Sequence, residues 1–365
     1  MKIAIIGSGI AGMGCAYLLS RQHEVVLYEK EARLGGHTHT HAVRQGNRDY
    51  QIDTGFIVFN PANYPLLSKL FSELNVVSQK TEMGFSVQNA ATGLEYNATN
   101  LNAMFCQRRN LVSPKFIRMT RDILRFYREC PSLLGLTGDG PTLGDYLADN
   151  QYSKLFIDDH IIPMACALWS SPSNIIAQFP AKYLVQFMQN HHMLQVNERP
   201  EWRVVQGGSS SYIGSLEKVW AVNVRLNAGV QSVSRLGDQV QIKTTGGDDN
   251  FDQVVFACHS DQALALLADA NTLEREILGD LPYQENETVL HTDATILPKN
   301  KKAWAAWNAF IPALNTQACT VSYCMNILQS VQSAEPFVVT LNRTADIAPD
   351  KIIAKMRYQH PMYTH

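Results

Sequence analysis

The chain has 365 residues, 45% of them hydrophobic, and its 31 Lys and Arg against 33 Asp and Glu give a formal net charge of -2 at pH 7. Such a chain can bury large cores, its length suggests two domains, and its balanced charge excludes a general attraction to nucleic acid. The seven cysteines form no CxxC pair, so we expect no complete disulfide framework and a reducing, cytoplasmic location. No apolar run approaches the roughly 18 residues that a membrane span needs.

A glycine-rich turn follows the first predicted strand. The apolar, β-branched run Lys2–Ile6 predicts a strand buried on both faces, and Met13–Leu19 predicts a helix. Between them stand Gly7, Ser8, Gly9, Ile10, Ala11 and Gly12. Gly7 permits a tight turn, Gly9 lets backbone N–H groups approach a pyrophosphate, and Gly12 lets helix and strand pack closely. The pattern predicts a dinucleotide-binding turn.

A second strand and a short motif continue this pattern. Glu24–Tyr28 predicts the strand, and Glu29 at its end stands about 20 residues past the first glycine, where a carboxylate accepts hydrogen bonds from an adenosine ribose. Its neighbour Lys30 joins the candidate binding residues. The following Arg33-Leu34-Gly35-Gly36 contains two small residues that let the chain pass beside a bound cofactor.

These motifs resemble the signature of the flavin-containing amine oxidase superfamily, in which an acidic residue and a short spacer precede Arg-x-Gly-Gly. The chain is similar to a bacterial branch of predicted NAD/FAD-binding, amine-oxidase-like proteins, which itself resembles the oxidase-like region fused to plant cyclopropane fatty acid synthases. The resemblance covers nearly all of the chain and is also carried by His37-Thr38, Asp53 to Asn60, Trp169-Ser170, Asn190-His191, Pro200 to Trp202, Gly207-Gly208, Trp307-Asn308 and Met325-Asn326.

The resemblance implies FAD as the cofactor and an α/β fold. A Rossmann-like FAD-binding domain would be interleaved with an α+β substrate domain, as in the amine oxidase and p-hydroxybenzoate hydroxylase-like architecture. We expect the FAD-binding domain at residues 1–79, 203–280 and 346–365, and the substrate domain at residues 80–202 and 281–345.

The resemblance also implies particular contacts with FAD. Asp53-Thr54-Gly55-Phe56 would run beside the flavin ring, and the backbone of Val230 would meet the adenine edge. His37 stands where amine oxidases usually carry a phosphate-facing arginine. From the residues alone, Asp53 is equally compatible with capping a turn.

The next segment predicts a hairpin, because His37 to Val43 alternates and Tyr50 to Gly55 returns after a turn. His37, His39 and His41 share one face of it. Three such histidines are compatible with a metal site, but no carboxylate or cysteine of ligand spacing accompanies them, so we expect no metal. Pro65 to Leu74 predicts an amphipathic helix.

Helices dominate after a hairpin predicted at Phe85 to Tyr96. Ser113 is a predicted N-cap with Pro114 at the first helical position, and the helix runs to about Cys130. Basic residues line one face of it, namely Lys115, Arg118, Arg121, Arg125 and Arg128. This pattern is typical of a solvated face, and the alternative is a stripe that docks weakly on an anionic lipid surface or acyl carrier.

Apolar helices follow, with N-caps expected at Thr142 and Ser153, a bend at Pro163 within Phe156 to Trp169, and a further helix from Pro180. Their aromatic and methionine-rich sets usually form a core. The alternative is an apolar substrate cavity with walls from Trp169, Phe187, Met188 and Trp202.

The chain then returns to the first domain through Val204 to Gly208 and a helix at Tyr212 to Val219. Further predicted strands are Val222 to Leu226, Val230 to Ser234, Gln239 to Thr244 and Val254 to Ala257, with Thr288 to Ile296 and Phe337 to Leu341 in the second domain.

The function that fits these motifs is an FAD-dependent oxidoreductase that takes a hydride from a C–H bond of an amine or an apolar, lipid-related substrate, because the cofactor carries the chemistry and no nucleophile motif is present. His291 and Lys299 are candidates for positioning a water or substrate. The alternatives are that His291 packs within a strand and that Lys299 lies in an exposed loop. The alternatives are a desaturase-like or isomerase-like flavoprotein acting on an acyl chain, and a non-catalytic binding protein of the kind that the Rab GDP dissociation inhibitors represent.

The C-terminal segment lacks an expected element. Related flavoproteins end with a strand, a glycine-containing turn and a helix whose N-terminus faces the flavin, whereas Tyr358 to His365 precedes no such element and no Gly follows Gly279. We expect a truncated form of a somewhat longer protein that binds FAD weakly or not at all.

Overall fold

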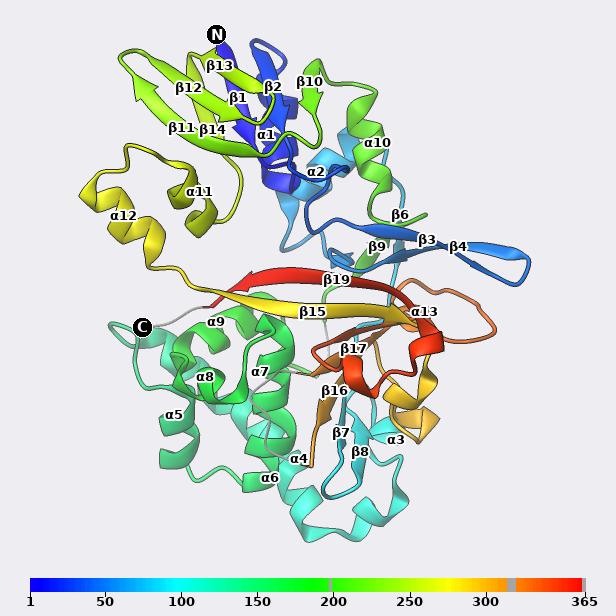
Figure 1. Ribbon diagram of the computed structural model, residues 1–365. Coiled ribbons are helices and arrows are strands. Elements are labelled where there is room, and N and C mark those ends of the chain that lie inside the picture. The colour runs from blue at the N-terminus through cyan, green and yellow to red at the C-terminus, as the bar shows by residue number, and fades with distance from the viewer. Residues whose placement is uncertain (197–198, 314–319, 363–365) are drawn as a thin grey trace.

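The first strand lies inside a parallel sheet with the order β10-β2-β1-β14 (Figure 1). The computed structural model describes residues 1–196, 199–313 and 320–362. The strands of this sheet are β1 (Lys2–Ile6), β2 (Glu24–Tyr28), β10 (Val222–Arg225) and β14 (Gln253–Phe256). The predicted bounds of the first two strands are confirmed, and the other two were predicted to within one residue.

Alternate residues of the sheet enter two separate cores, because successive side chains of a strand point to opposite faces. Ile5 packs with helices α1 (Ile10–Leu19) and α10 (Ser211–Glu217), whereas Ala4 and Ile6 face a second, antiparallel sheet. That sheet consists of β11 (Val230–Leu236), β12 (Gln239–Thr244) and β13 (Gly247–Phe251). Burial on both faces explains why the central strands β1 and β2 are almost continuously apolar.

Short elements carry the chain away from the parallel sheet. The predicted hairpin is confirmed as β3 (Thr40–Gln45) and β4 (Arg48–Asp53), although His37 and Thr38 precede it. The predicted helix is α2 (Pro65–Glu73). A three-stranded sheet of β5 (Val58–Phe59), β9 (Arg203–Val205) and β6 (Ser78–Lys80) joins the outgoing and returning chain.

A seven-stranded sheet, with the order β19-β15-β18-β17-β16-β7-β8, lies below the parallel sheet in Figure 1. All its neighbours are antiparallel except β16 and β7. Its strands are β19 (Ile352–Pro361), β15 (Tyr283–His291), β18 (Val338–Leu341), β17 (Val321–Cys324), β16 (Trp307–Ile311), β7 (Phe85–Asn89) and β8 (Leu94–Asn97).

Strand β19 corrects one sequence-based assignment. Residues 346–365 were expected in the FAD-binding domain, but β19 pairs with β15 from Ile352 to Pro361 and forms the edge of the seven-stranded sheet. The last three residues lie outside the described part of the chain. The alternation of charged and apolar residues in β19 is typical of an edge strand with one solvated face.

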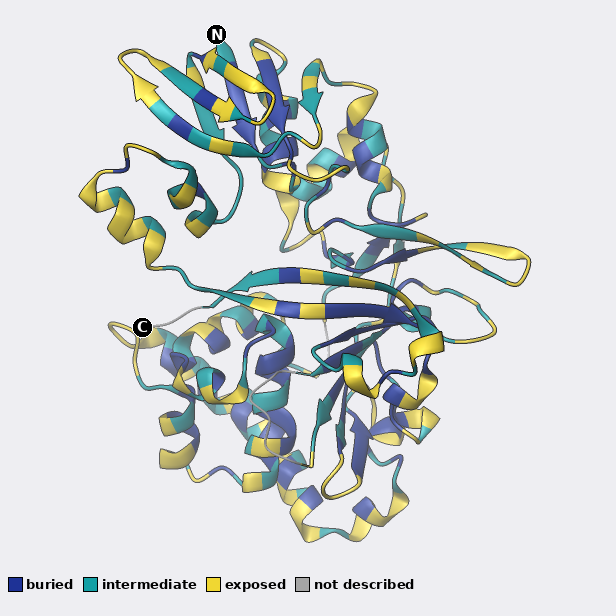
Figure 2. Cartoon of the chain, in the orientation of Figure 1, coloured by how far each residue is buried: buried dark blue, intermediate teal, exposed yellow. Residues whose placement is uncertain are grey.

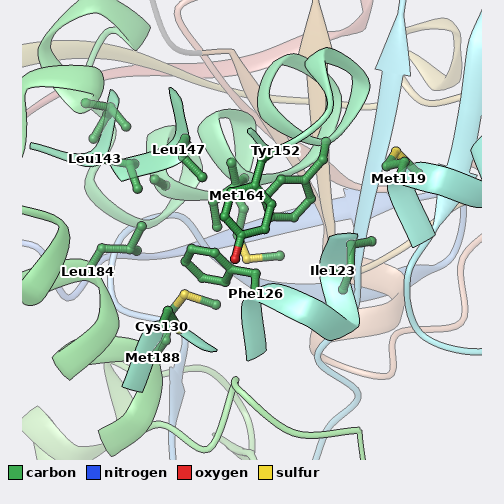
Figure 3. Close-up of a cluster of buried hydrophobic side chains, with 14 of the residues drawn as sticks. Met119, Ile123, Phe126, Cys130, Leu143, Leu147, Tyr152, Met164, Leu184 and Met188 are labelled. Atoms are coloured by element: carbon green, nitrogen blue, oxygen red, sulfur yellow. The ribbon is translucent and has the colours of Figure 1, made fainter. Parts of the chain in front are cut away.

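Helices pack on the seven-stranded sheet around one large core (Figure 3). They are α3 (Leu101–Met104), α4 (Pro114–Glu129), α5 (Leu143–Asp149), α6 (Lys154–Phe156), α7 (Ile162–Trp169), α8 (Ser173–Gln178) and α9 (Ala181–Asn190). Ser113 and Thr142 are confirmed as N-caps, since their hydroxyls accept hydrogen bonds from the N–H groups of Phe116 and Asp145. Ser153 is not: its hydroxyl makes no cap bond, and its N–H donates to Asp122.

Pro163 disturbs the helix that contains it, as predicted. Ile157–Ile161 forms a π-helical turn between α6 and α7. Proline cannot donate to the carbonyl four residues earlier, which is that of Asp159. The hydroxyl of Tyr96 donates to this carbonyl at 2.7 Å and so satisfies a buried acceptor that the proline leaves free.

Several elements were not predicted. They are the strands β5, β6, β13, β16, β17 and β19 and the helices α3, α8, α11 (Ser260–Leu266), α12 (Thr272–Gly279) and α13 (Met325–Leu328). Helix α12 has no buried residue and is mostly exposed in Figure 2. The strand expected at Thr288 to Ile296 is shifted toward the N-terminus, because Ala294–Ile296 forms a short 3-10 helix.

We predict that Phe126→Ala lowers the free energy of unfolding by about 3–5 kcal/mol. Phe126 is fully buried, and its ring centre lies 5.9 Å from that of Tyr152 and 5.7 Å from that of Phe156 (Figure 3). Chemical denaturation measures the loss. Leu124→Ala on the same helix is the control, because Leu124 is 52% exposed and should cost far less. Equal losses in the two variants would contradict this account of the core.

Candidate functional site

The glycine turn between β1 and α1 admits no side chain at two positions. A Cβ atom on Gly12 would lie 1.9 Å from the carbonyl oxygen of Gly7, and one on Gly7 would lie 2.7 Å from that of Ala257. Gly7 also has a φ of 102°, which favours glycine. Gly9 is the N-cap of α1. The first two residues of the helix, Ile10 and Ala11, are exposed. The turn therefore brings bare backbone to the positive end of a helix.

Glu29 lies beside this turn. Its carboxylate is buried and accepts hydrogen bonds from the backbone N–H of Ser8 at 3.0 Å, the hydroxyl of Ser8 at 2.5 Å and the N–H of Glu31 at 2.9 Å. The N–H of Ala228 donates to the carbonyl of Glu29 at 2.8 Å, which brings the start of β11 and Val230 close to the same strand end. Lys30 is exposed. The predicted residues thus lie together beside the glycine turn, and their contact with an adenosine stays a prediction.

Arg33 holds the Gly35-Gly36 turn together. Its guanidinium donates to the carbonyls of Thr38 at 2.9 Å and Gly36 at 2.8 Å. Gly36 has a φ of 57°, and a Cβ atom on it would lie 3.1 Å from the Cα atom of Gly9. The two glycine turns are therefore in contact, and Arg33 positions the second of them through backbone carbonyls.

Asp53 is a buried acceptor for protein donors. Its carboxylate accepts hydrogen bonds from the hydroxyl of Thr40 at 2.6 Å, the N–H of Ser209 at 2.8 and 3.0 Å, the hydroxyl of Ser209 at 2.9 Å and the amide of Gln329 at 3.0 Å. Burial raises the pKa of Asp53 to about 6, against the hydrogen bonds from Thr40 and Ser209. Donors from three segments therefore surround the carboxylate, and the expected place of Asp53 beside a flavin stays a prediction.

The residues after Asp53 lie against the His37 backbone. A Cβ atom on Gly55 would lie 1.8 Å from the carbonyl oxygen of His37, and the N–H of Phe56 donates to that oxygen at 2.9 Å. The Thr54 hydroxyl is 3.1 Å from the Tyr358 hydroxyl. Thr54, Gly55 and Phe56 therefore follow the second glycine turn and lie beside β19.

His37 is separated from the other two histidines of its motif. Its ring centre lies 5.0 Å from that of Tyr358 and 5.6 Å from that of His360, whereas the His39 and His41 rings lie 4.0 Å apart. Burial, followed by the neighbouring His360, His259 and Arg33, lowers the pKa of His37 to about 4. Within residues 1–196, 199–313 and 320–362, no group of three or more His, Cys, Asp and Glu side chains is placed to hold a metal ion.

The two predicted catalytic residues lie elsewhere. His291 is fully buried in β15, with Nε2 2.8 Å from the hydroxyl of Thr340 and Nδ1 accepting from the N–H of Asp293, and burial lowers its pKa to about 4. His291 lies five residues along β15 from Asn286, which pairs with Tyr358 of β19. At about 3.4 Å per residue, this separation is about 17 Å. We therefore correct its role to that of a packed strand histidine.

Lys299 is exposed, and its backbone N–H donates to Glu95 of β8. Strand β8 forms the edge of the seven-stranded sheet opposite β19. Six strand spacings of about 4.8 Å separate these edges, or about 29 Å. Lys299 therefore lies at the edge of this sheet opposite the one to which Tyr358 belongs.

The basic face of α4 finds partners within the chain. Arg125 donates to Glu129 at 2.8 Å and lies 4.4 Å above the Tyr152 ring, Arg128 donates to Glu129 at 2.9 Å, and Arg118 donates to the carbonyl of Gln151. These local contacts favour a solvated face of α4. They speak against the alternative, in which the same basic residues and Arg121 dock on an anionic surface. None of the helices in the described part of the chain has both the length and the apolar character that crossing a membrane requires.

Sequence reasoning missed His259, Tyr358 and His360, which surround His37, and Tyr283, which stacks on His259. His259 follows the predicted strand Val254 to Ala257 by two residues, and the carboxyl ends of parallel strands carry ligand sites, so it was within reach of the sequence. Tyr358 and His360 alternate on β19, which was not predicted as a strand.

Bare glycine turns at a helix N-terminus, a buried carboxylate at the end of the second parallel strand and an interleaved antiparallel sheet define a dinucleotide-dependent oxidoreductase fold. A family model described as flavin containing amine oxidoreductase matches residues 10–290, and the chain belongs to this family. Membership confirms the predicted fold class and the predicted protein class, an FAD-dependent oxidoreductase of the amine oxidase type. The similarity to the plant cyclopropane synthase fusions stays a prediction.

Solved structures share the fold. Cyclohexylamine oxidase from Brevibacterium oxydans IH-35A has a TM-score of 0.68 at 13% identity, covering 98% of this chain and 84% of that one. A CLA-producing fatty acid isomerase from P. acnes has a TM-score of 0.66 at 15% identity, covering 98% and 86%.

A local sequence match points to a third protein. The 15-cis-phytoene desaturase of Synechococcus elongatus is 38% identical over 77 residues, which is 21% of this chain and 15% of the desaturase. The match therefore spans a small part of the desaturase and carries no conclusion about the whole of it.

We predict that Gly12→Ala abolishes dinucleotide binding and destabilises the fold by about 1–3 kcal/mol, because the new methyl group meets the Gly7 carbonyl and pushes α1 from β1. Gly14→Ala is the matched control on the same helix, since a Cβ atom at Gly14 would meet no neighbouring group within 4 Å. Cofactor titration and chemical denaturation of both variants measure the effects. Normal binding by Gly12→Ala would show that the close contact is not required.

Proposed function

We propose that the chain binds FAD across the two glycine turns and oxidises a C–H bond of an amine or apolar substrate. The observation that supports this is the close contact of Gly36 with Gly9 beside the buried Glu29 carboxylate, which leaves backbone rather than side chains facing a ligand. The residues proposed for the adenosine and pyrophosphate end are Gly7, Ser8, Gly9, Ile10, Ala11, Gly12, Glu29 and Val230, and those for the flavin end are Gly36, His37, Thr54, Gly55 and Phe56.

We further propose a division of the chain into two units. The FAD-binding unit comprises residues 1–79 and 203–280, and the substrate unit comprises residues 80–202 and 281–345 together with β19. The pairing of β19 with β15 supports this placement of the C-terminal strand.

A bound flavin supplies a two-electron acceptor for the hydride that leaves the substrate carbon. The chain's own part is to orient the substrate and to exclude water. Thr54, Tyr358 and His39 lie together at the junction of β4 and β19, with the Tyr358 hydroxyl 3.1 Å from Thr54 Oγ1 and 3.4 Å from His39 Nδ1. These hydrogen-bonding groups are suited to hold a substrate without exchanging a proton with it.

An apolar substrate has a specific observation in its favour. Aromatic rings of α7, α9 and the approach to β9 form a ladder, in which Phe187 lies 5.3 Å from Trp169 and 4.0 Å from His191, and His191 lies 6.1 Å from Trp202. These four rings are only partly buried, whereas Met188 is fully buried in the core. The ladder supports a wall for an apolar substrate, so an acyl-chain desaturase-like or isomerase-like activity is the second candidate.

The cofactor proposal predicts tighter binding of FAD than of NAD in an equilibrium titration of the purified protein. Glu29→Ala should weaken FAD binding by about one to two decades, since it removes a charged acceptor of ribose hydroxyls. Glu31→Ala is the control, because the Glu31 side chain is exposed and only its backbone meets Glu29. Tighter binding of NAD, or equal FAD affinity in the wild type and Glu29→Ala, would contradict the assignment.

The substrate proposal predicts that the yellow, FAD-loaded protein bleaches under anaerobic conditions with its substrate. Bleaching by a primary or secondary amine supports the leading function, and bleaching only by an unsaturated acyl chain supports the second candidate. Trp169→Ala should raise the concentration of an apolar substrate needed for half-maximal bleaching, with Tyr183→Ala on the exposed face of α9 as control. A full-length protein that remains colourless and does not take up FAD would favour a non-catalytic binding role.

A further inference from the structure

Three histidine side chains from distant segments meet beside the glycine turns. His37 follows Gly36, His259 precedes α11 directly after β14, and His360 lies on β19. The His37 ring centre is 5.6 Å from that of His360 and 6.0 Å from that of His259. We call these three residues the imidazole cluster.

Neighbouring side chains hold the imidazole cluster in place. The Tyr283 ring stacks on His259 at 4.3 Å with an interplanar angle of 7°, and the Tyr358 ring packs edge-on against His37. The amide of Asn286 lies 3.1 Å from Nδ1 of His360. When that amide nitrogen donates, Nδ1 accepts and the proton of the neutral His360 ring stays on Nε2. His259 Nδ1 is buried without a hydrogen-bond partner among the described residues.

The position of the cluster links it to the anion-binding end of α1. His37 directly follows Gly36, which packs on Gly9, the N-cap of that helix. His259 follows Ala257 by two residues, and the Ala257 carbonyl faces Gly7 across the same turn. Two of the three imidazoles are therefore fixed at the carboxyl ends of β1 and β14, where a parallel sheet places its phosphate ligands.

Among the residues that the structure describes, the carboxylates near the cluster are the buried Asp53 and Glu29 and the exposed Asp261. The charged and titratable groups around the cluster come from several segments. They are Lys30, Arg33 and His39 from the segment between β2 and β3, Asp53 from β4, Tyr358 from β19, Tyr283 from β15, Cys258 from the loop after β14, and Asp261 from α11. Asp53 and Glu29 are occupied by the donors of Ser209 and Ser8. Burial and mutual repulsion lower the pKa of His37 to about 4 and also lower that of His360.

We propose that His37, His259 and His360 form a cradle for the phosphate groups of the dinucleotide, and that the cradle takes up protons when the anion binds. This inference rests on the proposed function. An anion among the imidazoles favours their charged forms, so it raises their pKa values above those of the free protein. At a pH between the pKa of an imidazole in the free protein and its pKa in the complex, binding of the anion takes up protons. The affinity for the anion therefore falls as the pH rises through this range.

The proton uptake is measurable without turnover. Isothermal titration calorimetry of FAD, and separately of ADP-ribose, in two buffers of different ionisation enthalpy gives the number of protons taken up. ADP-ribose contains the same kind of pyrophosphate diester without the flavin, and its phosphates do not change charge over this range. We expect uptake of about one proton and roughly tenfold tighter binding at about pH 6 than at about pH 8.

Single histidine substitutions test which side chains take up the protons on binding. His37→Gln and His360→Gln should each reduce the uptake and flatten the pH dependence, while His23→Gln should change neither. His23 precedes β2 at the opposite end of the parallel sheet and serves as the control. Thermal unfolding of each variant without ligand separates loss of the cradle from loss of the fold.

The outcomes separate the two proposals. FAD binding without proton uptake, or unchanged uptake in both histidine variants, would overturn the cradle and leave the proposed function standing. Proton-coupled binding of ADP-ribose without binding of FAD would support the cradle and overturn the function. Absence of binding by both ligands would overturn both.

Discussion

The architecture depends on one contact between backbone atoms. Gly12 of α1 approaches the Gly7 carbonyl so closely that a methyl group would lie 1.9 Å from it, and Gly7 in turn faces the carbonyl of Ala257. Helix α1 is therefore fixed against both β1 and β14, with its N-terminus at the edge where those strands end. No flexible side chain lies between these backbone atoms. The contact therefore helps to fix where the chain leaves this edge of the sheet, at His259 and at the Gly36 turn.

A second constraint joins the hairpin to the rest of the molecule. The Asp53 carboxylate connects Thr40 of β3, Ser209 of the returning loop and Gln329 after α13, which are far apart in sequence. A buried carboxylate is costly unless donors surround it, and here the donors come from the segments that must be aligned. This hydrogen-bond network fixes the position of Thr54, Gly55 and Phe56 beside His37. A residue that resembles a cofactor ligand in sequence thus also links three segments of the fold.

The sequence predicted the parts of the molecule that short-range patterns determine. The bounds of β1 and β2, the Ser113 cap of α4 and the disturbance at Pro163 follow from local residue types. The seven-stranded order and the place of β19 depend on pairings between distant segments, which local patterns do not encode. The same holds for the candidate site: Glu29 and Gly36 were proposed from spacing, whereas His360 joins His37 only through the pairing of β19 with β15.

The corrected places of His291 and Lys299 bear on the chemistry that the chain itself contributes. Both ring nitrogens of His291 have protein partners, and Lys299 lies beside the far edge of the large sheet. At the junction with β19, burial raises the pKa of Tyr358 and lowers the pKa of His39 to about 4, so both groups are neutral near pH 7. A site lined by neutral hydrogen-bonding groups orients a substrate and adds little charge around the bond that breaks. Such a site suits the loss of hydride from a neutral carbon centre, for which a strong acid or base in the protein is not required.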